Sequence, residues 1–256
     1  MSELVRTGKL RLRDYTPARV SLATAGHSLA TSEVLGFQLD HARARDAVHA
    51  AWNVAGFAER LRRELASAAG IEVLQLRSNA PNRAMYLRQP DLGRTLQQDS
   101  AEQLHTAACD LAIVVGDGLS ALAVERNAIA LLGLLLPRML GAGWTIAPIS
   151  LVDQARVGIG DAIGSLLGAR LSLVLLGERP GLSSADSLGV YLTWAPGPGR
   201  TDADRNCISN IRAGGLAQEA AAERLWWYLE NAKVQRRTGT MLKDGSRAAF
   251  EAGGPM

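Results

Sequence analysis

The sequence predicts an α/β protein built around a doubly wound, mostly parallel sheet with helices on both faces. Two apolar runs, Leu111–Val115 and Leu171–Leu176, are typical of strands that are covered on both sides. From residue 71 onward, strand patterns alternate with helix patterns, and this order of elements favours a parallel sheet. The first seventy residues show helical patterns instead. We therefore expect a helical domain at residues 1–70 and an α/β domain at residues 71–256.

The helical prediction for the N-terminal part depends on two segments. Thr31-Ser32-Glu33 is typical of a helix start, and apolar residues follow it at helical spacing. Residues 57–69 form a second amphipathic pattern, with apolar side chains four positions apart and charged side chains around them. Gly70 stands where a helix of this kind ends.

The elements after residue 70 follow from the length and the period of each pattern. Apolar or alternating segments predict strands at residues 71–76, 111–115, 144–149, 171–176 and 189–194. Longer periodic segments predict helices at residues 100–108, from about 119 to 141, at 159–167 and at 216–237. Ligands of such sheets bind outside the carboxyl ends of the strands. The loops that begin at Gly116, at Gly177 and near Pro196 are therefore the candidates for a binding site.

Composition and charge exclude several classes of protein. The chain of 256 residues has 28 basic and 25 acidic side chains, and a net charge of +3 is too weak to indicate nucleic-acid binding. Its two cysteines, Cys109 and Cys207, build neither a disulfide framework nor a zinc site. The most apolar stretch, residues 128–136, is too short to cross a membrane, and charged residues interrupt any signal peptide. We therefore expect a cytoplasmic protein without a membrane or nucleic-acid partner.

Gly116–Ala121 matches the G-x-G-x-x-A pattern of a dinucleotide-binding turn, since it follows a predicted strand and precedes a predicted helix. Such a site also requires an acidic residue about 20 positions later, at the end of a second strand. The corresponding region, residues 131–139, is apolar and has no acid. A tight turn is the favoured interpretation, and a dinucleotide-binding oxidoreductase is the alternative.

Two further polar segments follow predicted strands. Gly177–Leu182 places Glu178 where a ligand-facing loop begins, although a local ion pair with Arg179 explains the same pattern. Residues 201–211 are interpreted as a second polar loop. Its Cys207 has no histidine or second cysteine nearby, so a catalytic thiolate is not favoured. We interpret Cys207 as a small residue that packs against a ligand or another chain. No catalytic residue and no metal ligand are predicted.

Five motifs, taken in order, carry a resemblance to a known family. They are Tyr86–Arg94, Gly116–Ser120, Arg156–Ile159, Gly177–Leu182 and Asp204–Ile211. With them the chain resembles the small (light) subunit of ethanolamine ammonia-lyase, from about residue 14 to residue 235. The last two motifs are the most specific, because both their order and their separation match.

The resemblance implies a helical N-terminal part, a Rossmann-like C-terminal domain and a partner, the large subunit, whose barrel holds the substrate. Adenosylcobalamin is then expected between the paired subunits of a hetero-oligomer, where its radical chemistry converts ethanolamine to acetaldehyde and ammonia. The family's cobalamin contacts in this subunit correspond to Val157, Glu178 and Cys207. The resemblance leaves two locations open, the cytoplasm and a bacterial microcompartment.

Two alternatives to a cobalamin-binding lyase subunit stay open at this point. One is the stand-alone oxidoreductase that the Gly116–Ala121 turn suggests. The other is a scaffold subunit that assembles with a partner and does not touch the cofactor. The lack of an evident nucleophile or metal motif agrees with a cofactor that performs the chemistry while a partner holds the substrate.

Overall fold

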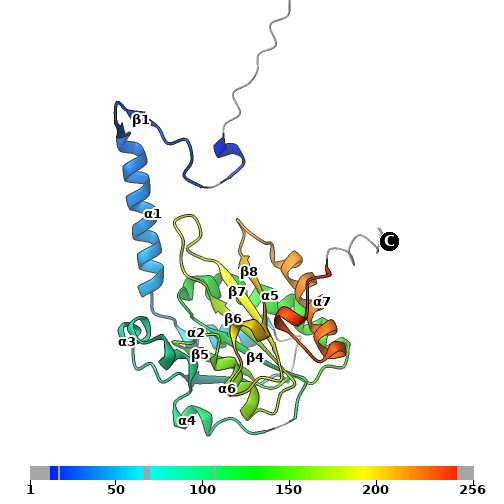
Figure 1. Cartoon of the computed structure of the whole chain (residues 1–256). Coiled ribbons are helices and arrows are strands. Elements are labelled where there is room, and N and C mark those ends of the chain that lie inside the picture. The colour runs from blue at the N-terminus through cyan, green and yellow to red at the C-terminus, as the bar shows by residue number, and fades with distance from the viewer. Residues whose placement is uncertain (1–11, 17, 66–69, 107, 247–256) are drawn as a thin grey trace, which may run out of the picture.

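A computed structural model describes residues 12–16, 18–65, 70–106 and 108–246 of the chain. Its centre is a six-stranded sheet with the order β3-β5-β4-β6-β7-β8 (Figure 1). The strands are β3 (Val73–Arg77), β4 (Leu111–Gly116), β5 (Ile149–Asp153), β6 (Leu171–Gly177), β7 (Leu188–Trp194) and β8 (Arg205–Ile211). The first four strands in this order are parallel, whereas β7 and β8 are antiparallel additions beside β6. The α/β prediction is confirmed with a mixed sheet.

Helices cover both faces of the sheet. Neighbouring residues of a strand point to opposite faces, so each face has apolar side chains that a helix must bury. The covering helices are α2 (Val54–Glu64), α5 (Ala121–Gly141), α6 (Ile159–Leu166) and α7 (Gln218–Gln235). In β4, Ile113 belongs to the large core that α2, α5 and α7 complete, and the next residue, Val114, belongs to a second core beneath α6. Every residue of β4 and β6 is buried, which explains why both strands lack the polar alternation of a half-exposed strand.

The predicted strand at residues 144–149 begins later than expected, at Ile149. Pro148 lies directly before it and has no N–H to donate to a neighbouring strand. Trp144 is buried instead against Trp226 of α7, with ring centroids 6.3 Å apart. Ile146 still forms an isolated parallel bridge with Leu111 of β4, so the predicted strand is reduced to a single bridge before Pro148.

The predicted helix at residues 100–108 is reduced to the single turn α4 (Gln98–Ala101). Ser100 is buried, and its hydroxyl accepts a hydrogen bond of 2.9 Å from the backbone N–H of Arg77 in β3. Ala108 has a φ of 44°, a left-handed value through which a right-handed helix does not continue. Anchoring to the sheet therefore overrides the helical pattern of this segment.

The polar loop predicted at residues 201–211 is wrong in its second part, because Arg205–Ile211 forms strand β8. Ile208 and Ile211 face the core, Arg205 and Asn206 are half-buried, and Cys207, Ser209 and Asn210 are exposed. An edge strand has water on one side, so charged and polar residues are common in it. The correction moves Cys207 from a loop onto a strand.

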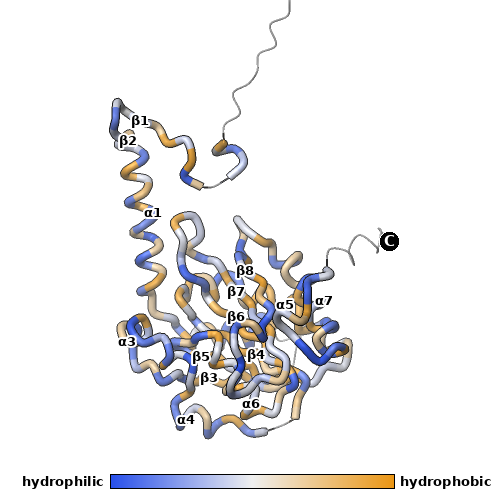
Figure 2. The backbone as a smooth tube through the Cα atoms, in the orientation of Figure 1, coloured by the Kyte–Doolittle hydropathy of each residue, from blue (hydrophilic) through white to orange (hydrophobic). Residues whose placement is uncertain are grey.

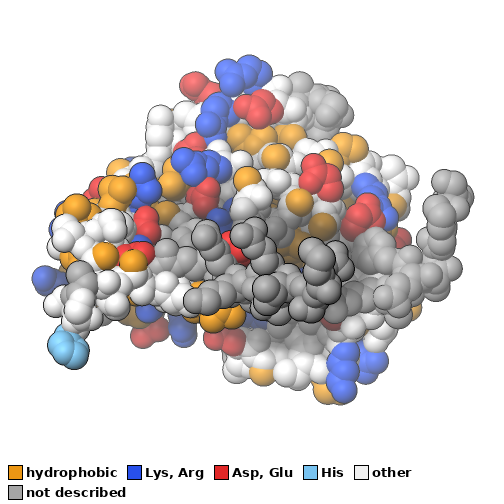
Figure 3. Space-filling model, turned by 90° about the horizontal axis from the view of Figure 1, so that it is seen from above, with side chains coloured by type: hydrophobic (Ala, Val, Ile, Leu, Met, Phe, Trp, Pro, Cys, Tyr) orange, Lys and Arg blue, Asp and Glu red, His pale blue; other side chains and the backbone are white. Residues whose placement is uncertain are grey.

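Helix α1 (Thr31–His49) stands away from the sheet and begins directly after a short hairpin (Figure 1). The hairpin consists of β1 (Thr24–Ala25) and β2 (Ser28–Leu29). Ala47 is the buried residue of this helix, whereas Leu35 is 59% and Leu39 is 51% exposed. Orange segments along α1 in Figure 2 mark its hydrophobic residues, and orange side chains lie on the same side of the molecule in Figure 3.

Helix α2, by contrast, is part of the main core. Phe57, Ala58 and Leu61 are buried there together with residues of the sheet. The boundary between domains 1–70 and 71–256 stays a prediction. Residues 66–69, which end the second predicted helix, lie outside the described residues.

The most apolar stretch of the sequence, residues 128–136, lies in α5 and is largely buried, as predicted. Pro137 follows it within the same helix. Among the described residues, no helix is long and apolar enough to cross a membrane.

Candidate functional site

The turn at Gly116–Ala121 packs tightly against the end of β6. The N–H of Leu119 donates to the carbonyl oxygen of Gly177 at 2.8 Å, and Gly118 has a φ of 55°. Ser120 caps α5 by accepting from the N–H of Ala123 at 3.2 Å, and its hydroxyl donates to the carbonyl of Ala185 at 2.7 Å. The chain's own groups therefore surround the start of α5, which supports the tight-turn interpretation of the glycines.

Beneath this turn, Asp117 and Arg83 form a buried ion pair. Arg83 belongs to α3 (Arg83–Arg88), and its Nη1 lies 3.0 Å from Oδ2 of Asp117, whose side chain is 1% exposed. The same guanidinium donates to the carbonyls of Val48 at 2.6 Å and Gly118 at 2.8 Å. Burial raises the pKa of Asp117 to about 7, although Arg83 acts in the opposite direction. This pair joins α1, α3 and the turn at the carboxyl end of the sheet.

Glu178 begins the loop after β6, as predicted, and its carboxylate is held in place on one side. Oε2 accepts a hydrogen bond of 3.1 Å from the N–H of Asn210 and another from the hydroxyl of Ser187. Within the described part of the chain, Glu178 forms no ion pair with Arg179, so that alternative from the sequence is not realised here. Oε1 accepts no hydrogen bond from the described residues and stays available.

Cys207 lies on β8 directly opposite Tyr191 of β7. Burial raises the pKa of the Cys207 thiol to about 11; Tyr191 acts in the lowering direction, and the Glu178 carboxylate adds to the increase. Burial also raises the pKa of Tyr191, and both Cys207 and Glu178 contribute. Glu178 and Cys207 are thus electrostatic neighbours on one face of the sheet.

We expect Cys207 to react slowly with iodoacetamide at pH 7.5, although the residue is exposed. A thiol with a pKa of about 11 is almost wholly protonated there, which reduces its alkylation rate about a hundredfold relative to an ordinary exposed cysteine. Mass spectrometry after timed labelling measures this rate, and the urea-unfolded chain is the control. Labelling of the native chain as fast as that of the unfolded chain would contradict the expectation.

A cavity of about 830 Å³ opens between α6, the 3-10 helix η3 (Pro90–Arg94) and residues 197–202, and Val157 lies in its wall. Arg156, Asp161 and Arg205 line it as well. This volume is in the range of pockets that hold drug-sized ligands. The cavity adjoins the carboxyl end of β5, as expected for a sheet of this class.

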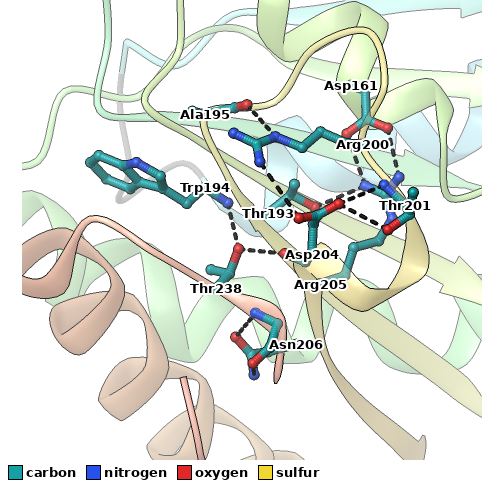
Figure 4. Close-up of polar contacts among 11 residues, drawn as sticks. Asp161, Thr193, Trp194, Ala195, Arg200, Thr201, Asp204, Arg205, Asn206 and Thr238 are labelled. Atoms are coloured by element: carbon teal, nitrogen blue, oxygen red, sulfur yellow. Dashed lines mark hydrogen bonds and ion pairs between the residues drawn. The ribbon is translucent and has the colours of Figure 1, made fainter. Parts of the chain in front are cut away.

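A buried ion pair holds two sides of this cavity together (Figure 4). Arg205 of β8 donates from Nη1 and Nη2 to the two carboxylate oxygens of Asp161 in α6, at 2.8 Å and 2.7 Å. Their side chains are 5% and 12% exposed, and Thr193 accepts a further hydrogen bond from Arg205 at 3.0 Å. The bidentate geometry fixes β8 relative to α6.

The structure brings two of the predicted residues together and links the third to them through a strand. Glu178 and Cys207 both act on Tyr191, and Val157 shares its cavity with Arg205, which precedes Cys207 by two positions on β8. Tyr191 and Arg205 were missed by sequence reasoning. Neither residue had a clear signal in the sequence. Tyr191 is one position of a predicted strand, and in residues 205–211 the buried Ile208 and Ile211 are three positions apart, so no regular alternation marks the strand.

Comparison with known proteins covers nearly the whole chain. Residues 7–243 match the family described as ethanolamine ammonia-lyase light chain (EutC). An ethanolamine ammonia-lyase small subunit from Azotobacter vinelandii is 51% identical over 245 residues, which is 93% of this chain and 89% of the relative. The small subunit from Bradyrhizobium diazoefficiens is 51% identical over 246 residues, covering 94% and 92%.

A third relative, the small subunit from Pseudomonas putida strain W619, is 49% identical over 241 residues, which is 92% of this chain and 87% of the relative. Matches of this extent include the core strands, the turn at Gly116, the Glu178 loop and β8. The chain belongs to the ethanolamine ammonia-lyase light-chain family.

Proposed function

We propose that the chain is the small subunit of an adenosylcobalamin-dependent ethanolamine ammonia-lyase, and that Val157, Glu178 and Cys207 contact the cobalamin. Family membership supports the subunit role. The observation that carries the cofactor proposal is the state of Glu178. Its Oε2 is fixed by Asn210 and Ser187, and its Oε1 is left to accept a hydrogen bond from a ligand.

The residues present fit a large corrin that carries many amide groups. Amide N–H groups are donors that a carboxylate oxygen accepts. Gly189 leaves room for Glu178, since a Cβ at that position would lie 2.9 Å from Oε1. Cys207 is small and exposed, and Val157 presents apolar surface at the cavity, so both permit close approach of a flat ring.

When bound, the cofactor supplies the radical chemistry of the reaction. The residues of this chain bind and orient it. Glu178 accepts a hydrogen bond from an amide N–H of the corrin. Its carboxylate is fixed for this role by the backbone N–H of Asn210. Cys207 and Tyr191 have raised pKa values and stay neutral at neutral pH, so they add no charge to the surface against the ring.

The partner in this proposal is the large subunit, which holds the substrate. Helix α1 supports a protein partner of this kind. An isolated helix with exposed Leu35 and Leu39 is marginal in water, and contact with a second protein stabilises it. We propose that the large subunit covers α1 in the assembled hetero-oligomer.

The fold family and the location of the chain are part of the same proposal. The four parallel strands β3, β5, β4 and β6, with helices on both faces, support a Rossmann-like assignment of the C-terminal part. A cytoplasmic chain, with packaging in a microcompartment as the second option, agrees with the family. The oxidoreductase alternative is weakened because the start of α5 is occupied by Ser120 and Ala185.

Replacing Glu178 with alanine is expected to weaken adenosylcobalamin binding by the complex about tenfold to a hundredfold. A hydrogen bond to a charged group contributes about 1.5–3 kcal/mol, and about 1.4 kcal/mol corresponds to a factor of ten. The experiment combines the variant with the large subunit and measures the Kd by titration of the absorbance. Glu219→Ala, at an exposed position of α7, is the matched control.

Assembly of each variant with the large subunit is measured in parallel by analytical ultracentrifugation. If Glu178→Ala assembles normally and binds the cofactor with unchanged affinity, the residue is not a cobalamin contact and the scaffold alternative gains support. If the unaltered pair binds no adenosylcobalamin, the proposed function itself is wrong.

A further inference from the structure

The cavity beside Val157 contains an arginine that has no acceptor among the described residues. Four arginines and two aspartates line the cavity, so its wall has an excess of positive charge. The arginines are Arg94, Arg156, Arg200 and Arg205, and the aspartates are Asp161 and Asp202. The pairing of each arginine decides which of them is free to bind a ligand.

Three of the four arginines already have partners. Arg205 is held by both carboxylate oxygens of Asp161. Arg200 donates to the carbonyl of Ala195 at 2.9 Å and pairs with Asp204 at 3.6 Å. Arg94 lies 3.5 Å from Asp91 at the exposed rim.

Arg156 differs from these three. Its guanidinium forms no hydrogen bond and no ion pair with any described residue, and its Nε is buried without a partner. The group lies over the ring of Tyr86, 4.4 Å from the centroid, and the Tyr86 hydroxyl is itself fixed by donating to the carbonyl of Ala155 at 2.8 Å. Stacking on a fixed ring holds the guanidinium in one orientation while its donors stay unused.

We propose that Arg156 binds the phosphodiester of the nucleotide loop of adenosylcobalamin. This inference rests on the proposed function, since it assigns a part of the same ligand. Arg156 and Val157 are sequence neighbours and line one cavity, so a cofactor that contacts Val157 comes within reach of the guanidinium. The phosphodiester carries a single negative charge, and a planar guanidinium is suited to its paired oxygens.

The charge of the cavity favours a singly charged group over a polyphosphate. Within the described part of the chain, one guanidinium of the cavity lacks a partner, and Asp161 and Asp202 lie in the same wall. Additional phosphates would meet these carboxylates without further free cations, and like charges repel. A diester bound by one arginine therefore matches the charges that are present.

The test compares adenosylcobalamin with adenosylcobinamide, which has the same corrin but lacks the phosphodiester and the nucleotide base. Both are titrated into the complex of this chain with the large subunit. Arg156→Gln is expected to weaken adenosylcobalamin binding about tenfold or more, to leave adenosylcobinamide binding within twofold, and to be partly rescued by Arg156→Lys. Arg88→Gln, an exposed arginine outside the cavity, is the control and is expected to change neither Kd.

A second measurement keeps the proposal testable if the cobinamide binds too weakly to titrate. The phosphorus NMR resonance of bound adenosylcobalamin is expected to differ from that of the free cofactor, and to return toward the free position in the complex with Arg156→Gln. An unchanged Kd and resonance in that variant would overturn the proposal, as would an equal loss of affinity for both corrinoids.

A binding test with inorganic phosphate distinguishes two sources of the negative charge that Arg156 binds: the cofactor and a free anion. Binding of phosphate to the complex that depends on Arg156, with no effect of the variant on adenosylcobalamin, would assign the cavity to an independent anion and overturn the inference. Failure of the unaltered complex to bind either corrinoid refutes the proposed function itself, and is thus distinguishable from a failure of the Arg156 assignment.

Discussion

Replacing Arg83 with methionine is expected to lower the free energy of unfolding by about 3–5 kcal/mol. The substitution leaves the carboxylate of Asp117 buried at 1% exposure without its counter-charge, and it removes donors from the carbonyls of Val48 and Gly118. An uncompensated buried charge is among the most destabilising changes that a single substitution makes. Denaturation in guanidinium chloride at pH 8 measures the loss.

The effect of this substitution is expected to depend on pH. The native pKa of Asp117, about 7, lies above its ordinary value of 3.8, so the native chain holds the proton more tightly than the unfolded chain. The contribution of this group to stability therefore falls as the pH rises from about 4 to 7. Loss of Arg83 raises the native pKa further, because Arg83 acts in the lowering direction. The variant should thus lose less stability at pH 6 than at pH 8.

Two further variants test the explanation. Arg63→Met removes an exposed arginine of α2, whose side chain is 72% exposed, and is expected to change stability by less than about 0.5 kcal/mol. Arg83→Met combined with Asp117→Asn is expected to recover part of the loss, since the buried charge is gone. Equal destabilisation by Arg83→Met at pH 6 and pH 8 would argue against an electrostatic cause.

Replacing Gly177 with alanine is expected to cost about 3 kcal/mol or more. A Cβ at this position would lie 2.0 Å from the carbonyl oxygen of Ser120 and 2.5 Å from that of Asp117. Both are backbone atoms of the turn before α5, so they cannot move aside as a flexible side chain does. The added methyl group must separate β6 from the turn and weaken the hydrogen bond between Leu119 and Gly177. Thermal unfolding and the soluble yield on expression measure the effect.

Gly36→Ala is the matched control for this substitution. Gly36 lies within α1 and nothing is within 4 Å of a Cβ built there. Alanine favours a helix interior over glycine by about 0.5–1 kcal/mol, so this variant is expected to be neutral or stabilising. If Gly177→Ala and Gly36→Ala unfolded at the same temperature, the close approach at the end of β6 would not constrain the fold as described.

The sequence predicts the central strands well and the edge of the sheet poorly. Burial on both sides makes β4 and β6 apolar at every position, and such a run is distinct from loops and amphipathic helices. At the edge, β8 has water on one side, and its polar residues resemble a loop. The antiparallel direction of β7 relative to β6 was not predictable either, because the hydrophobic pattern of a strand does not distinguish parallel from antiparallel pairing.

The candidate site shows the same division. Glu178 was placed correctly at the start of a loop because it follows a recognisable buried strand. The partners that fix its carboxylate, Ser187 and the backbone of Asn210, come from residues 9 and 32 positions away and leave no local pattern. The cavity beside Val157 is assembled from three separate segments, so its existence depends on tertiary packing alone.

The exposed arm α1 has a consequence for how a cell handles this chain. Leu35 and Leu39 are exposed in the chain alone, and exposed apolar surface promotes self-association and recognition by chaperones and proteases. A surplus of this chain over its partner is therefore expected to aggregate or to be degraded. The proposal that the large subunit covers α1 therefore predicts balanced synthesis of the two polypeptides.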